Sequence, residues 1–217
     1  MAEIKICGLK LDSDIDAINQ YEPEYTGMVI YFPKSSRNVT EELAQSLIGK
    51  IKTGINKVAV TVSPSLEQAS MIKKLGFDYI QIHGDVSQEV IDNTTLPIIR
   101  AVNISEKDSP SQFEKELEKI VRWDNIYGVL FDAGTPGSGK TFDWKSIERI
   151  QESVRKSGLK LFLAGGLNEH NVSEAVSQVN PDVVDVSSGV EYDDRPAGSG
   201  KDADKIKSFI KNARALS

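Results

Sequence analysis

The sequence predicts an α/β fold of the (β/α)₈, or TIM-barrel, type, with a single domain over residues 1–217. Eight short apolar runs alternate with segments whose apolar residues have helical spacing. The runs are nearly continuous, as in parallel strands buried on both faces, and polar or glycine-rich residues follow each of them. No linker or change in composition divides the chain. A doubly wound open sheet is the alternative, but it seldom uses eight regularly spaced units.

The first half of the chain supplies four strand and helix units. Strands are expected over residues 4–7, 27–32, 57–62 and 79–82. Helices are expected after them over residues 11–21 and from residues 40, 65 and 87, with a polar loop at 33–38. Thr40 and Ser65 are of residue types that cap helices, and Asp12 or Ser13 is expected to cap the first one. Gly76 is placed to end the third helix.

The second half supplies the other four units. Strands are expected over residues 97–102, 128–132, 161–163 and 183–186. Helices are expected over about 111–121, 143–154 and 168–176 and from 202, with a glycine-rich loop at 133–142. Pro97 occupies the first position of its strand, where it disturbs pairing least. Asp143, Asn168 and Asp202 are expected to cap the helices that follow them.

The composition excludes several classes of protein. Contents of 39% hydrophobic and 27% charged residues are typical of a soluble globular protein. A net charge of −6 argues against nucleic acid as a partner, because that would need a clustered basic face. No apolar run is long enough for a membrane span and the N-terminus lacks a signal-like segment, so we expect a cytoplasmic protein without a membrane partner. One cysteine excludes an internal disulfide, and with only two histidines it predicts no metal site.

Two loops near the C-terminus resemble an anion-binding site. Gly165 and Gly166 follow one predicted strand, and Ser187, Ser188 and Gly189 follow the next. Two neighbouring parallel strands would bring these loops together, so that free N–H groups and hydroxyls converge on a phosphate. The last two loops of a (β/α)₈ barrel are the usual phosphate site. The plainer interpretation, that these are ordinary turn glycines, fits one such loop better than it fits the pair.

Three side chains at predicted strand ends suggest chemistry. Cys7 is either a small buried hydrophobe or a proton-transferring base with a lowered pKa. Asp132 ends the run GVLFD, where a carboxylate would be costly to ionise unless it is solvated or positioned for a task. Arg37 offers a planar fork that suits a carboxylate, and its alternative is a surface salt bridge.

Other polar residues complete the predicted rim. Gln81 and His83 lie in and after the fourth strand, and Asp185 lies in the eighth. We expect His83 to support the site by contacts rather than to react. Asp185 is expected either to take part in the site or to brace the phosphate loop. His170, at the start of a helix, is expected at the surface.

Seven motifs carry a resemblance that goes beyond spacing. They are KICGLK at 5–10, FPKSSR at 32–37, QIHG at 81–84, FDAGTPGSGKTFDW at 131–144, LAGGLNEHNV at 163–172, DVSSGVE at 185–191 and GKD at 200–202. In this order they resemble the phosphoribosylanthranilate isomerases of tryptophan biosynthesis, a family of (β/α)₈ barrels. Ser36, where the family usually has proline, Ser63, where asparagine is common, and a short loop after Asp132 depart from its pattern.

The resemblance implies an activity and roles for residues. The reaction is the Amadori rearrangement of N-(5-phospho-β-D-ribosyl)anthranilate to 1-(2-carboxyphenylamino)-1-deoxy-D-ribulose 5-phosphate, by general acid and base catalysis. Cys7 is implied as the base, Asp132 as the acid and Arg37 as the contact of the anthranilate carboxylate, with the two C-terminal loops on the phosphate. The substrate nitrogen is the electron sink, so no cofactor is expected. The expected partner is this phosphorylated amino sugar, and both monomer and homodimer remain open.

Two other functions compete with this one. Residues 134–141, GTPGSGKT, satisfy the Walker A pattern, which suggests a P-loop NTPase. Its context argues against it, because the next helix is expected to start only at Asp143 and only two strands follow. A sensor that binds a phosphorylated ligand without catalysis is the third hypothesis. It would use the loops and Arg37 but leave Cys7 and Asp132 without a chemical role.

Overall fold

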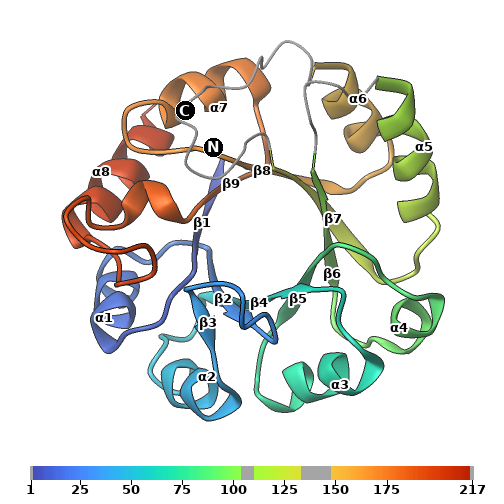
Figure 1. Cartoon of the computed structure of the whole chain (residues 1–217). Helices are drawn as coiled ribbons and strands as arrows, with labels where there is room; N and C mark the ends of the chain where they lie inside the picture. The colour runs from blue at the N-terminus through green and yellow to red at the C-terminus, as the bar shows by residue number, and fades with distance from the viewer. Residues whose placement is uncertain (1, 104–109, 133–147, 216–217) are drawn as a thin grey trace.

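Parallel strands and helices alternate along the chain in the computed structural model, which describes residues 2–103, 110–132 and 148–215. The strands are β1 Glu3–Cys7, β2 Tyr25–Ile30, β3 Asn38–Val39, β4 Asn56–Val62, β5 Tyr79–His83, β6 Ile98–Asn103, β7 Ile126–Asp132, β8 Lys160–Ala164 and β9 Val183–Val186. The helices are α1 Asp12–Tyr21, α2 Glu41–Ile48, α3 Leu66–Lys74, α4 Gln88–Asn93, α5 Pro110–Ile120, α6 Glu148–Lys156, α7 Val172–Val179 and α8 Ala203–Arg214. Figure 1 shows the helices arranged in a ring around the strands.

The sheet closes on itself through its first strand. β1 pairs in parallel with β2 on one side and with β9 on the other, so Lys5 lies opposite both Tyr25 and Asp185. The other strands follow in chain order from β4 to β9, and every ladder is parallel. The predicted (β/α)₈ barrel is therefore confirmed.

The second unit differs from the prediction in detail. The strand expected at 27–32 spans Tyr25–Ile30, because Tyr31 takes a positive φ of 61° and the extended backbone stops there. The loop expected at 33–38 ends in the short strand β3, which pairs with Val29 and Ile30. Its two residues, a polar one and an apolar one, are too few to show a strand period in the sequence.

Side chains of the strands point alternately into the barrel and outward to the helices. On β1, Ile4 and Ile6 join the outer core under the helices, whereas Cys7 belongs to the inner cluster. Tyr25, Tyr79 and Phe162 pack edge to face in the inner cluster, with ring centroids 5.7 and 5.6 Å from Tyr25. Aromatic rings therefore fill part of the barrel interior.

Three of the predicted helix N-caps are confirmed, at Thr40, Ser65 and Asp202. Thr40 accepts a hydrogen bond from the Leu43 N–H, and Asp202 accepts from the N–H groups of the first turn of α8. In α1, however, Leu11 holds the cap position instead of Asp12 or Ser13. Asp14 in the first turn reaches back to accept from the N–H of Leu11 at 2.9 Å.

The cap expected at Asn168 is wrong. Helix α7 begins at Val172 with Asn171 in the cap position. Asn168 Oδ1 instead accepts from the N–H groups of His170 and Asn171 at 2.8 and 3.2 Å, and so caps the turn before the helix. Both asparagines are of a capping type, so residue type alone could not separate them.

None of the helices in these three ranges is both long and apolar enough to cross a bilayer.

Candidate active site

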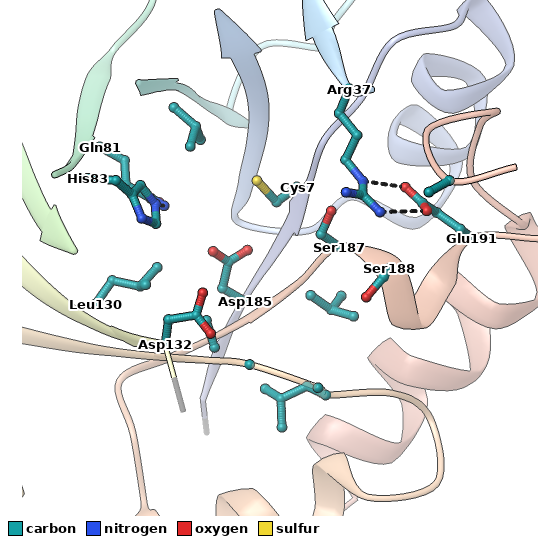
Figure 2. Close-up of a pocket in the computed structure, with 17 residues that line it drawn as sticks. Cys7, Arg37, Gln81, His83, Leu130, Asp132, Asp185, Ser187, Ser188 and Glu191 are labelled. Carbon is teal, nitrogen blue, oxygen red and sulfur yellow. Dashed lines mark hydrogen bonds and ion pairs between the residues drawn. The ribbon is translucent and has the colours of Figure 1, made fainter. Parts of the chain in front are cut away.

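A cavity of about 410 Å³ opens at the carboxyl ends of the strands (Figure 2). The residues predicted for the site that line it are Cys7, Arg37, His83, Asp132, Asp185, Gly165, Gly166, Ser187 and Ser188. They come from loops and strand ends spread over the whole chain, and barrel closure brings them together. Gly189 is the one predicted site residue that does not line the cavity.

Cys7 ends β1 and is 7% exposed. Burial raises the pKa of its thiol above the ordinary value, although the Lys5 ammonium acts in the opposite direction. The buried position of Cys7 therefore opposes the lowered pKa considered from the sequence, and Lys5 is the neighbour that favours it. Asp132 ends the paired part of β7 opposite Ala164 of β8, and Figure 2 shows its carboxyl group facing the same space as Cys7.

Lys5 and Asp185 form an ion pair next to Cys7. Lys5 Nζ lies 2.6 Å from Asp185 Oδ2, and the side chains are 0% and 7% exposed. Burial alone would lower the pKa of Lys5, but the carboxylate of Asp185 raises it overall. Asp185 Oδ1 is buried and has no hydrogen-bond partner in the part of the chain that the structure describes. Asp185 thus pairs with Lys5 inside the barrel. The alternative considered from the sequence was that it braces the phosphate loop.

Arg37 lies in the loop between β2 and β3 and reaches the cavity rim. Its Nε and Nη2 atoms donate to the two carboxylate oxygens of Glu191 at 2.6 and 2.8 Å. Lys201 Nζ donates to Glu191 Oε1 at 3.1 Å and to the Ser187 carbonyl at 2.9 Å. Lys201 is fully buried, so a cation lies directly behind the loop that follows β9.

His83 lies at the end of β5 beside Gln81. The Gln81 amide nitrogen lies 2.8 Å from His83 Nε2, which accepts this hydrogen bond only if it carries no proton. Burial, with Lys5 and Arg100 nearby, lowers the pKa of His83 to about 4. His83 is therefore neutral near pH 7 and fits the supporting role expected from the sequence. His170 is exposed, as expected.

The two C-terminal loops meet as predicted, since β8 and β9 are neighbours. Gly166 has a φ of 65°, and a Cβ at this position would have no atom within 4 Å, so its backbone is open to the cavity. For Gly189, the prediction that its backbone is open to a phosphate is wrong. A Cβ there would lie 2.0 Å from the Leu167 carbonyl oxygen, so glycine is required because the two loops pack together and not because a ligand approaches.

Three residues of the site were not singled out from the sequence. Lys5 carried a signal, because the two-residue period of a strand places it on the same face as Cys7. Glu191 and Lys201 lie inside the motifs DVSSGVE and GKD, but nothing in the residue types showed that they would pair. A buried lysine requires a partner carboxylate, and these partners come from distant parts of the chain.

Some predictions fall outside the described residues. These are the Walker-type segment 134–141, the cap at Asp143 and the length of the loop after Asp132. In the ranges that are described, no three His, Cys, Asp or Glu side chains are arranged to hold a metal ion.

Comparison with known proteins gives a consistent result. Residues 4–212 match the family model described as N-(5'phosphoribosyl)anthranilate (PRA) isomerase. An N-(5'-phosphoribosyl)anthranilate isomerase of Clostridium kluyveri is 39% identical over 220 residues, and one of Thermoanaerobacter pseudethanolicus is 38% identical over 222, with all of each chain covered.

Solved structures agree with these relatives. Phosphoribosyl anthranilate isomerase from Thermotoga maritima superposes with a TM-score of 0.82 at 32% identity, with both chains fully covered. A structure of phosphoribosyl anthranilate isomerase in complex with reduced 1-(o-carboxyphenylamino)-1-deoxyribulose 5-phosphate reaches 0.80 at 30% identity, again over both whole chains. The chain therefore belongs to the phosphoribosylanthranilate isomerase family.

Proposed function

We propose that this chain catalyses the Amadori rearrangement of N-(5-phospho-β-D-ribosyl)anthranilate to 1-(2-carboxyphenylamino)-1-deoxy-D-ribulose 5-phosphate, with Cys7 as general base and Asp132 as general acid. The observation that carries the proposal is that both residues line one cavity in a member of this family. A thiol and a carboxyl group on one cavity are what a proton transfer between carbon and oxygen requires. The described residues need only bind, orient and move protons, because the substrate nitrogen supplies the electron sink.

The reaction proceeds in three steps. Asp132, protonated, donates to the furanose ring oxygen, and cleavage of the bond to carbon 1 leaves a positively charged iminium. Cys7, as thiolate, removes the proton from carbon 2, and the electron pair of that C–H bond forms the double bond of an enolamine. The enolamine gains a proton at carbon 1 and loses its hydroxyl proton, which gives the ketone. Proton exchange with solvent then removes the proton from Cys7 and restores the protonated form of Asp132. The acid and the base each contribute about 10²–10⁴-fold to the rate.

The remaining site residues anchor the two ends of the substrate. Arg37 is proposed to hold the anthranilate carboxylate by charge-assisted hydrogen bonds. The loops at Gly165, Gly166, Ser187 and Ser188 are proposed to hold the phosphate, with the Lys201 cation behind Ser187. Anchoring at both ends fixes carbon 2 near the thiol, which supplies the part of the rate that comes from positioning.

The molecular context follows from the same proposal. We take residues 1–217 as one barrel domain that acts in the cytoplasm, where tryptophan is made. Its partner is a small phosphorylated amino sugar, and it works as a monomer or a homodimer, without nucleic acid, membrane or cofactor. Dialysis against a chelator is expected to leave activity unchanged.

The proposal is tested with purified protein and phosphoribosylanthranilate, by following the loss of anthranilate-type fluorescence. Cys7→Ser and Asp132→Asn are expected to lower kcat by at least about 10²-fold while the affinity for the reduced product analogue stays near wild type. Asp16→Asn, an exposed carboxylate on α1, is the matched control and should behave as wild type. Wild-type turnover by a folded Cys7→Ser protein would show that the thiol only packs. Binding of the analogue without any turnover by the wild type would favour a sensor.

A further inference from the structure

Glu191 links two loops at the rim of the cavity, the loop after β2 and the segment between β9 and α8. Besides Arg37 and Lys201, its carboxylate accepts a hydrogen bond from the Gly198 N–H at 3.3 Å. Arg37 comes from the loop after β2, Glu191 follows β9, and Gly198 and Lys201 lie before α8. The Glu191 side chain is only 8% exposed, so these contacts hold a buried carboxylate and not a solvated one.

Among the described residues, Glu191 is the hydrogen-bond partner of the Arg37 guanidinium, and it uses only part of its donors. A guanidinium has five N–H groups, and Glu191 takes the one on Nε and one on Nη2. The second N–H of Nη2 and those of Nη1 form another fork, on a different edge of the same plane. Figure 2 shows the two contacts between Arg37 and Glu191. A second carboxylate can bind the other edge of the guanidinium while Glu191 remains in place.

The charges of this cluster favour an added anion. Burial opposes ionisation of Glu191, but the hydrogen bond from Arg37 and the charge of Lys201 hold its pKa below the usual range. Burial lowers the pKa of Lys201, and Glu191 opposes that change. The contacts of Glu191 place two cationic side chains, Arg37 and Lys201, around one carboxylate, and this excess of cationic groups at Glu191 favours a ligand carboxylate on the remaining edge of Arg37.

We propose that Glu191 is a positioning residue that turns the free edge of Arg37 toward the anthranilate carboxylate. The proposal rests on the proposed function, because it takes Arg37 as the carboxylate contact. It adds that selectivity for a carboxylated ring depends on Glu191, a residue that does not itself touch the substrate.

The test compares two ligands, the reduced product analogue and the same compound without the ring carboxylate, by calorimetry. In Glu191→Gln, the first should bind about tenfold more weakly and the second within about twofold of wild type, since one charge-assisted interaction is loosened. In turnover, KM should rise while kcat changes little, as expected for a contact made equally in the ground and transition states. In an Arg37→Ala background, Glu191→Gln should have no further effect on the carboxylated ligand.

Two further variants keep the test decisive. Glu22→Gln removes an exposed carboxylate that pairs with Lys52 at 2.6 Å, and should leave both affinities unchanged. Arg37→Lys keeps the charge but not the fork, so it should also lose the preference for the carboxylated ligand even if Glu191→Gln fails to fold.

Three outcomes would overturn the proposal. Tighter binding of the carboxylated ligand by Glu191→Gln would mean that Glu191 competes with it for Arg37. A wild-type preference that survives in Glu191→Gln or in Arg37→Lys would overturn the positioning role alone. Equal affinity of the wild-type protein for the two ligands would remove the role of Arg37 as well, whereas Cys7 and Asp132 would still be judged by turnover.

Discussion

Lys5 and Asp185 face each other across β1 and β9, with Nζ and Oδ2 2.6 Å apart and both side chains buried. The pair places a cation next to Cys7, where burial disfavours the charged form of the thiol and the Lys5 ammonium favours it. It also leaves Asp185 Oδ1 buried and without a hydrogen-bond partner among the described residues. Stability and reactivity therefore depend on the same ion pair.

We expect Lys5→Met to lower the free energy of unfolding by about 3–5 kcal/mol, because it leaves a buried carboxylate unpaired. The double variant Lys5→Met with Asp185→Leu should recover much of this loss, since no uncompensated charge remains. Lys50→Met, which breaks an exposed pair with Asp12, is the control and should cost no more than about 1 kcal/mol. Urea denaturation measures all three, and an unchanged midpoint for Lys5→Met would contradict the pairing.

The Cys7 thiol should ionise at higher pH than a free cysteine, because burial raises its pKa. Since the chain has one cysteine, the pH dependence of its alkylation by iodoacetamide reports this group alone. Because the pKa of this thiol is higher in the folded than in the unfolded protein, its contribution to stability is fully present at pH values below the unfolded pKa. The contribution is lost as the pH rises through the folded pKa. Cys7→Ser should remove that alkaline loss. An alkylation midpoint below that of a free thiol would contradict the prediction.

The two loop glycines should respond differently to substitution. In Gly166→Ala the added Cβ has room, so the only expected cost to stability is about 1–2 kcal/mol of strain from the positive φ. The Cβ would lie where the backbone is open to the cavity, so phosphate-bearing ligands should bind more weakly. Gly189→Ala would place its Cβ against the Leu167 carbonyl and should mainly lower the melting temperature. Melting curves and titration with the reduced product analogue separate these effects. Equal melting temperatures for the two variants would argue against the packing reason for Gly189.

His83 should make the protein less stable in acid. Its pKa of about 4 in the folded protein lies below the ordinary value, so the stability that it contributes is present above about pH 6.5 and is lost as pH falls toward 4. At pH 4.5 the loss attributable to this group should be about 2–3 kcal/mol. Urea unfolding at pH 7 and pH 4.5 should show a smaller change for His83→Gln than for the wild type. His170→Gln, at the other and exposed histidine, should match the wild type.

The barrel could be predicted because its strands are short, apolar and regularly spaced, and because polar residues follow each of them. Details that depend on competing local backbone conformations and caps could not be predicted. Tyr31 ends β2 by adopting a positive φ, which no periodicity reveals. Asn168 and Asn171 are equally good caps by residue type, and only the turn between them decides where α7 begins.

The cavity residues could be predicted because parallel strands bring their carboxyl ends to one rim. The ion pairs behind them could not, since each joins residues that are far apart in the chain. Lys5 and Asp185 are separated by 180 positions, and Arg37 and Glu191 by 154. The sequence predicts backbone that is open to a ligand at both Gly166 and Gly189, and the structure shows open space at Gly166 but not at Gly189. The difference between them depends on a single carbonyl oxygen of the neighbouring loop.

The closure of β1 on β9 has a consequence for how the protein is made. During synthesis β1 leaves the ribosome early, but its second neighbour is complete only when residues 183–186 have emerged. Cys7 and Asp185 lie on the two sides of this seam, so a nascent chain has no assembled site until nearly all of it is available. Contacts of such long sequence separation are the slow ones to form. Recovery of turnover on refolding should therefore lag behind recovery of helical circular dichroism, and would report the joining of the first and last strands.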